Sequence, residues 1–118
     1  MKFPDKKYNI IYADPPWGST LTSQVNDPNA SRVVPYNSMR FCDILDLPVN
    51  DISDSNCCLF LWTIASMLPD ALYVMKAWDF YFKTVAFTWV KRNKKSDSWF
   101  WGMGSWTRSN PEYCLLGI

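Results

Sequence analysis

The 118-residue chain contains no histidine, and its four cysteines form no Cys-x-x-Cys pair. Histidine and closely spaced cysteines are the usual ligands of zinc, so a zinc site would lack its common donors, and we expect no metal. The spacing does not indicate a disulfide framework either, and we expect buried free thiols in a reducing compartment. The cysteines are Cys42, Cys57, Cys58 and Cys114.

The chain also lacks a long apolar run. Residues 1–7 do not contain the apolar stretch of a signal peptide, and Cys57–Trp62 is far too short to cross a membrane. With 48% apolar and 19% charged residues, the composition is that of a globular protein. We therefore expect one soluble, cytoplasmic domain with no membrane partner.

No strong excess of charge of one sign is present. The formal net charge is +1, so a contact with a polyanion must come from a local cluster of basic residues. Aromatic residues, in contrast, are abundant, with seven Trp, six Tyr and seven Phe. Core packing explains any single ring by default, but this number leaves rings for a stacking surface.

The most distinctive segment is the turn Asp14-Pro15-Pro16-Trp17, which follows the apolar run Tyr8–Ala13. Proline fixes φ and offers a carbonyl without an N–H group, so the turn is stiff and rich in acceptors. A carboxylate and a large aromatic ring at the end of a strand could grip a planar ring that carries an amine. The alternative is a strand-ending turn with a tryptophan in the core.

Apolar patterns predict four strands, two helices and two long loops. The first strand has apolar residues on both faces, so we expect it to be fully buried. The strands are expected at Tyr8–Ala13, Cys57–Trp62, Lys83–Val90 and Glu112–Gly117, the helices from a Ser38 cap to about Leu47 and from a Ser66 cap to about Trp78, and the loops at Gly18–Val34 and Lys91–Ser109.

This alternation predicts an α/β sandwich with a mainly parallel sheet. In such sheets the functional crevice lies beyond the carboxyl ends of the strands, where the Asp14 turn and Trp62 are expected. Leu115–Ile118 ends the chain within an apolar strand, and a domain seldom ends on an unfinished element of this kind. We therefore expect a truncated C-terminus.

Five segments, in order, resemble the DPPW-type adenine-N6 methyltransferases. This family includes the catalytic subunit of the messenger-RNA adenosine methyltransferase and many bacterial and phage DNA adenine methyltransferases. The resemblance covers nearly the whole chain, and five ordered segments are far more specific than the tetrapeptide alone. The segments are Tyr12–Trp17, Pro35–Met39, Leu59–Thr63, Trp89–Asn93, and Gly104–Trp106 with Glu112–Gly117.

The resemblance implies a Rossmann-like fold, S-adenosylmethionine as the methyl donor and the 6-amino group of adenine as the acceptor. Asp14 and the carbonyl of Pro15 would accept hydrogen bonds from that amine, with Pro16 completing the catalytic turn. Trp17 would stack on the purine, and Asp14 would also face the methionine end of the cofactor. Tyr36 would line the adenine pocket, although an ordered turn tyrosine is an equal alternative.

A second group of residues would face the polymer. Lys91, Arg92, Lys94 and Lys95 could contact phosphates beside Asn93, and a solvated charge run is the alternative. Arg108 and Glu112 could orient the loop over the substrate or form an ordinary surface ion pair. For Trp62 we expect packing rather than a cofactor contact. Trp106 belongs to the segment that resembles the family block, and we place it with the substrate residues.

The chain departs from the family pattern at two points. The later segments that hold the ribose and methionine portions of the cofactor do not follow Ile118. Residues 1–118 are therefore expected to be the N-terminal, catalytic-motif part of one methyltransferase domain. Asp79 stands where the family usually has glycine after the helix, and a left-handed backbone there would be strained.

The expected function is S-adenosylmethionine-dependent methylation of adenine in nucleic acid. DNA in a bacterium or phage is favoured over RNA. A non-catalytic nucleic-acid-binding fragment or a remnant of such an enzyme is one alternative. A methyltransferase that acts on RNA adenosine or on a protein amide is another.

Overall fold

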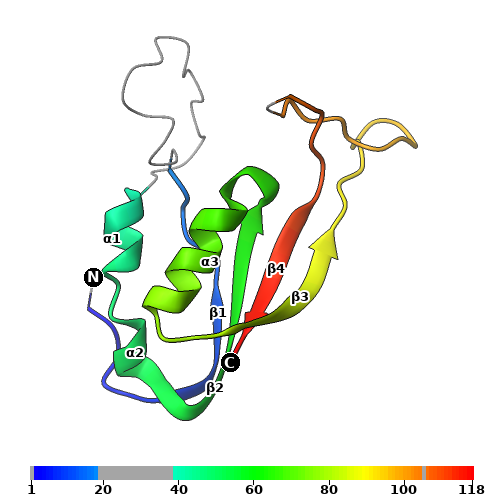
Figure 1. Ribbon diagram of the computed structural model, residues 1–118. Helices are drawn as coiled ribbons and strands as arrows, with labels where there is room; N and C mark the ends of the chain where they lie inside the picture. The colour runs from blue at the N-terminus through cyan, green and yellow to red at the C-terminus, as the bar shows by residue number, and fades with distance from the viewer. Residues whose placement is uncertain (1, 19–38, 105) are drawn as a thin grey trace.

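The computed structural model describes residues 2–18, 39–104 and 106–118, which form one sheet and a layer of short helices (Figure 1). In chain order the elements are β1 (Tyr8–Ala13), α1 (Phe41–Leu45), α2 (Val49–Ile52), β2 (Ser53–Ile64), the 3-10 turn η1 (Ala65–Met67), α3 (Leu68–Ala77), β3 (Phe82–Trp89) and β4 (Glu112–Gly117).

The sheet is mixed, with strand order β1-β2-β4-β3. β1 pairs with β2 in parallel, whereas β4 runs antiparallel to both β2 and β3. The α/β class is confirmed, but the expectation of a mainly parallel sheet is wrong, because only one of the three pairings is parallel. β4 returns beside β3 as the second arm of a long hairpin, and an apolar run carries no information about strand direction.

The carboxyl ends of β1, β2 and β3 meet the start of β4 at one edge of the sheet, the upper edge in Figure 1. Ala13 pairs with Leu61 there, and Trp89 pairs with Glu112. The segments 90–104 and 106–111 project beyond this edge as an arm (Figure 1). We call this border the catalytic edge, after the catalytic role expected of Asp14, which follows Ala13 directly.

α3 packs on one face of the sheet and forms the core with β2 and β4. Leu59, Leu61 and Leu115 are fully buried on that face, and α3 contributes Val74 and Met75. These side chains account for much of the apolar area that folding removes from water.

Gly117 lets β4 approach α3 closely. A Cβ atom at this position would lie 2.8 Å from Sδ of Met75, closer than van der Waals contact allows.

The opposite face of the sheet is open among the described residues. Ile10 and Tyr12 are 65% and 67% exposed, so the expected full burial of the first strand is wrong. Phe87 of β3 is 57% exposed and stacks on Phe60 with ring centroids 6.1 Å apart. Both faces of β1 are apolar, but α3 covers only one of them.

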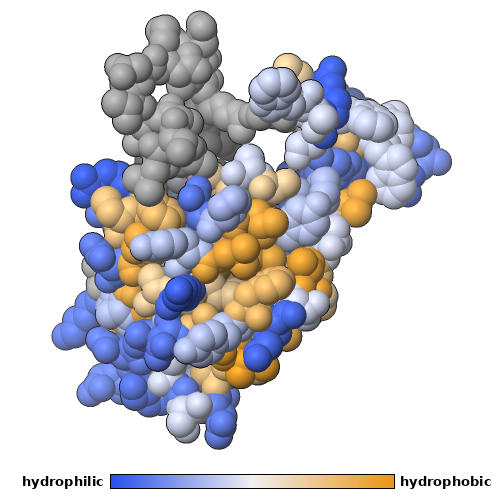
Figure 2. Space-filling view, in the orientation of Figure 1, coloured by the Kyte–Doolittle hydropathy of each residue, from blue (hydrophilic) through white to orange (hydrophobic). Residues whose placement is uncertain are grey.

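Figure 2 shows the face that carries α3. Apolar residues gather over α3 and the strands beside it, while hydrophilic residues surround the α2 end of the molecule. β3 extends past the helix, and its Val85, the partner of the buried Leu115, remains 42% exposed.

The helix boundaries differ from those expected. The first expected helix is present as the shorter α1, whereas α2, which follows Pro48, was not predicted, and the expected Ser38 cap lies outside the described residues. The Ser66 cap is wrong, because a 3-10 turn occupies 65–67 and Met67 precedes the first residue of α3. Pro69 lies in the first turn of α3, as predicted. A 3-10 turn often precedes an α-helix, and here it places the first residue of α3 after Ser66.

The left-handed turn expected at Asp79 is confirmed by its φ of 67°. The N–H of Asp79 donates to the carbonyl of Lys76 at 3.0 Å, and that of Phe80 donates to Met75 at 3.0 Å. This pair of bonds is a Schellman motif, which closes a helix and usually has glycine at its left-handed position.

Candidate active site

Two prolines and a tryptophan attach the Asp14 turn to the sheet. The N–H of Trp17 donates to the carbonyl of Pro15 at 2.7 Å, which closes a three-residue turn centred on Pro16. The indole Nε1 of Trp17 donates to the carbonyl of Trp62 at 2.9 Å, and the ring is only 7% exposed. The turn is therefore anchored to the end of β2.

The burial of Trp17 bears on the role expected for it. Its ring belongs to the core cluster and offers little surface on which a base could stack. The carbonyl of Pro15 likewise already accepts one hydrogen bond, although a carbonyl oxygen has a second lone pair for an amine. The stacking role of Trp17 stays a prediction, and the structure shows the residue as the brace of the turn.

Asp14 is exposed at the catalytic edge, and its carboxylate accepts no hydrogen bond from the described residues. Its negative charge reaches Cys114 of β4. Burial raises the pKa of the Cys114 thiol, and the charge of Asp14 raises it further. The carboxylate of Asp14 and a buried thiol with a raised pKa therefore lie within electrostatic reach of each other.

Two aromatic residues lie beside Asp14. Nε1 of Trp62 donates to the hydroxyl of Tyr12 at 2.6 Å, and Trp62 pairs with Cys114 across the sheet. The expectation that Trp62 serves packing stays a prediction, and this hydrogen bond was not foreseen. Only the alternation of the strands, which puts Tyr12 and Trp62 on the face opposite the core, could have indicated this contact.

The polymer-facing residues begin at the end of β3. Nζ of Lys91 lies 3.6 Å from Oε1 of Glu112 and 5.2 Å from the ring centroid of Trp89. Glu112 therefore pairs with Lys91 and not with Arg108, whose Nη1 lies 3.1 Å from Sδ of Met103.

Asn110 holds the base of the arm and was not identified from the sequence. Its side chain accepts from the N–H of Lys91 at 2.7 Å and donates to the carbonyls of Lys91 and Phe100 at 2.9 and 2.6 Å. The only signal was the Asn-Pro dipeptide, which marks a turn.

Internal contacts hold the remaining residues of the arm. Arg92 pairs with Asp97 and lies over the ring of Trp99, with 5.3 Å from Cζ to the centroid. Asn93 donates to the Ser98 hydroxyl at 2.8 Å, so it organises the arm. Trp106 is fully exposed at the tip, with a φ of 71°. Lys94 and Lys95 are also exposed.

Two of the expected features lie outside the described residues. Tyr36 is one, and the loop expected at Gly18–Val34 is the other, apart from Gly18. The residues that the structure brings together at the catalytic edge are the Asp14 turn, Tyr12, Trp62 and Cys114, with the Lys91–Glu112 pair at the same border.

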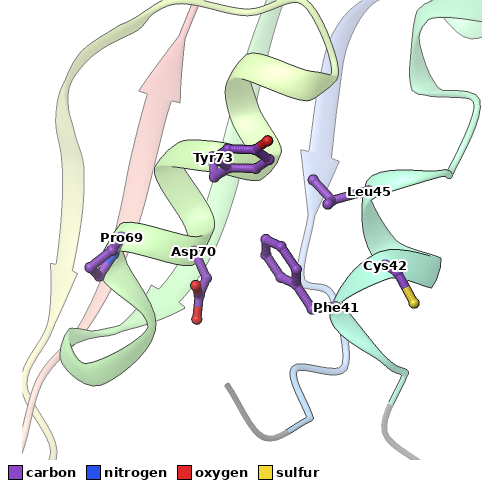
Figure 3. A pocket seen from close by; sticks show the side chains of 6 residues that line it. All are labelled: Phe41, Cys42, Leu45, Pro69, Asp70 and Tyr73. Carbon is purple, nitrogen blue, oxygen red and sulfur yellow. The ribbon is translucent and has the colours of Figure 1, made fainter. Parts of the chain in front are cut away.

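A separate groove of about 530 Å³ lies between α1 and α3 (Figure 3). The rings of Phe41 and Tyr73 form its walls, with centroids 6.0 Å apart. Asp70 also lines it, and burial raises the pKa of this carboxyl. No residue of the Asp14 turn lines the groove, which belongs to the helical layer.

Within the described part of the chain, no three or more His, Cys, Asp or Glu residues gather in a way that could hold a metal ion. None of the helices in that part is both long and apolar enough to span a membrane.

Two known proteins are similar to this chain over nearly its whole length. The chain is 30% identical to the type II methyltransferase M.MunI of Mycoplasma sp, over 98% of this chain and 52% of the relative. It is also 30% identical to the N6-adenosine-methyltransferase non-catalytic subunit MTB of Arabidopsis thaliana, over 95% of this chain and 14% of the relative. The chain thus spans about half the length of the first protein and a small part of the second. The MT-A70 family model matches residues 8–118, and the chain belongs to the MT-A70 family.

Proposed function

We propose that this chain carries the acceptor-side part of an S-adenosylmethionine-dependent methyltransferase that modifies the 6-amino group of adenine in nucleic acid. The observation that carries the proposal is the exposed Asp14 carboxylate on a rigid turn at the catalytic edge. The proposal includes a Rossmann-like sandwich in which residues 1–118 hold the catalytic motif. M.MunI, the relative of which the larger share is matched, is a type II methyltransferase, and we favour DNA for this reason.

The chemistry requires acceptors beside a weak nucleophile. The lone pair of the adenine amine is delocalised into the ring, and positive charge grows on nitrogen as the methyl group transfers. The carboxylate of Asp14 and the second lone pair of the Pro15 carbonyl would accept the two N–H groups and stabilise that charge. Since Trp17 fixes the turn to β2, the acceptors do not have to reorganise during the reaction.

The negative charge of Asp14 also suits the proposed cofactor. S-adenosylmethionine supplies an electrophilic methyl group on a sulfonium and carries an ammonium group. An exposed carboxylate is a suitable partner for either cation, and Asp14 provides one at the catalytic edge. Holding the donor and the adenine amine next to each other would itself supply much of the acceleration.

The arm would then form the wall that faces the polymer. Lys94 and Lys95 are exposed beside the exposed rings of Trp99 and Trp101. Cations among aromatic rings suit a nucleic-acid strand whose bases are unstacked. If the substrate is duplex DNA, the adenine must be flipped out, which costs a few kcal/mol.

One observation favours a second function. MTB is named as a non-catalytic subunit, so a binding module without transfer activity is an alternative for this chain. The intact Asp14 turn argues against it.

The test is transfer of labelled methyl from S-adenosylmethionine to unmethylated DNA and to RNA. We expect N6-methyladenine on one polymer and a loss of about 10²–10³-fold in Asp14→Ala, the size typical for removal of one transition-state acceptor. Asp5→Ala removes another exposed carboxylate and is the matched control, which should keep full activity. Undiminished transfer by Asp14→Ala would refute the assignment. Oligonucleotide binding without transfer by the wild type would support the non-catalytic function.

A further inference from the structure

The burial of Trp17 leaves the question of which ring receives the purine. A stacking platform must be exposed and must lie on the side of the sheet from which Asp14 is reached. Side chains alternate along a strand, and Ile11 and Ala13 pack against the core, so Tyr12, two residues before Asp14, projects to the opposite side. That side is the open face, where Tyr12 is 67% exposed.

Asp14 also lies within electrostatic reach of this face. Its charge acts on the thiol of Cys114, and the register pairs Cys114 with Trp62 and Phe87. Trp62 in turn donates its indole N–H to the hydroxyl of Tyr12. The thiol and the two rings therefore form one row on the open face, and the carboxylate of Asp14 lies within electrostatic reach of the thiol.

The hydrogen bond from Trp62 also holds the phenol ring of Tyr12 in one orientation. Its donor–acceptor distance is 2.6 Å, and Trp62 itself is half-buried and anchored in β2. An exposed ring fixed in this way loses little side-chain entropy when a base stacks on it. About 6.6 Å of strand separates the Cα atoms of Tyr12 and Asp14, so a purine over the ring can extend its amine to the carboxylate.

We propose that Tyr12, positioned by Trp62, is the platform on which the acceptor adenine stacks, and that Trp17 braces the turn. This inference rests on the proposed function and names a substrate contact within it. Tyr12 touches the base, whereas Trp62 acts through Tyr12 and is a positioning residue.

Two measurements test the proposal. The first is steady-state methyl transfer, with KM determined separately for the nucleic acid and for S-adenosylmethionine. The second is quenching of one 2-aminopurine in a single-stranded oligodeoxyadenylate, which reports stacking without requiring transfer. Tyr81→Ala is the matched control, because Tyr81 is 69% exposed and lies at the far end of β3.

We expect Tyr12→Ala to lower kcat/KM for the nucleic acid by about fivefold to 150-fold, the usual range for loss of one base-stacking ring. KM for S-adenosylmethionine should not change, and quenching of 2-aminopurine should be lost. Tyr12→Phe and Trp62→Phe keep both rings but break the hydrogen bond, so each should show a smaller loss. The double variant should lose no more of its kcat/KM than either single variant, because both substitutions remove the same hydrogen bond.

The platform is refuted if Tyr12→Ala quenches 2-aminopurine as the wild type does, or if it raises KM for S-adenosylmethionine instead. These results differ from failure of the proposed function. A wild-type chain that transfers no methyl but quenches 2-aminopurine through Tyr12 would keep the platform and refute transfer by residues 1–118 alone.

Discussion

At the scale of single residues, the arrangement separates the group proposed to contact the substrate from the group that supports it. Asp14 is exposed, while Trp17, three residues later, is buried with its indole N–H on a β2 carbonyl. The two prolines between them make the link stiff. The motif therefore holds one carboxylate in a fixed position.

This view predicts the effect of Trp17→Phe. Phenylalanine keeps an aromatic ring but removes the donor to the Trp62 carbonyl and part of the buried volume. The free energy of unfolding should fall by about 1–3 kcal/mol. It is measured by urea denaturation, and methyl transfer should fall as well because the turn is no longer held.

Trp78→Phe is the matched control. Trp78 is 3% exposed, and its Nε1 donates to the carbonyl of Ile44 at 3.1 Å, away from the catalytic edge. The Trp78→Phe variant should lose a similar amount of its free energy of unfolding, but below its melting temperature it should keep the wild-type rate of methyl transfer. Unchanged stability in Trp17→Phe would show that its ring does not brace the turn.

At the scale of elements, the end of α3 contains a residue that the local backbone disfavours. Asp79 has a φ of 67° at the left-handed position of the Schellman motif. The bonds at this position use only the backbone, so the side chain adds strain without supplying either hydrogen bond.

We therefore expect Asp79→Gly to stabilise the protein. Relief of left-handed strain exceeds the entropic cost of glycine by roughly 0.5–1 kcal/mol, which raises Tm by about 2–6 °C. Asp79→Ala keeps a Cβ atom at the same φ and loses the tolerance of Asp, so it should lower Tm. Scanning calorimetry of the three proteins tests the order, and a lower Tm for Asp79→Gly would show that the Asp side chain stabilises the turn.

The elements also show what could be predicted from the sequence. The bounds of β1 and β4 were predicted correctly, because each is a short apolar run limited by polar or proline residues. The direction of β4 was not predicted, since antiparallel return depends on how the arm folds back through Asn110. The start of α3 was misplaced, because a 3-10 turn precedes it.

The candidate site was foreseen to a similar extent. The motif identified Asp14 and its edge of the sheet, because that prediction needs only the end of one strand. The burial of Trp17 and the pairing of Glu112 with Lys91 depend on neighbours distant in sequence. Tertiary contacts of this kind are not encoded in a local pattern.

At the scale of the whole molecule, helices cover one face of the sheet and leave the other open among the described residues. The consequence is that buried groups concentrate between α3 and the sheet and within the sheet itself. Cys57 and Cys114 are both buried, and burial is the main cause that raises the pKa of each thiol.

These two thiols predict how stability depends on pH. A thiol in the unfolded chain ionises near pH 8.5, whereas the buried thiols ionise at a higher pH. Between those values the folded state binds more protons, so stability is fully present below about pH 8.5 and is lost as the pH rises toward the folded pKa. Each thiol can contribute a slope of up to about 1.4 kcal/mol per pH unit. The measurement is urea denaturation between pH 7 and 9.5.

A cysteine variant isolates the cause of this slope. Cys57→Ala combined with Cys114→Ala should flatten it while lowering stability at every pH, because two buried side chains become smaller. Cys42 is exposed, so Cys42→Ala should leave the slope unchanged.

In Asp14→Asn the charge that raises the pKa of Cys114 is gone, so its thiol should titrate at a lower pH, which the Cβ chemical shift of Cys114 would report. If the Cys114 thiol titrates at the same pH in Asp14→Asn as in the wild type, the carboxylate lies away from the open face. That result would also contradict the Tyr12 platform, which requires Asp14 to lie near this face.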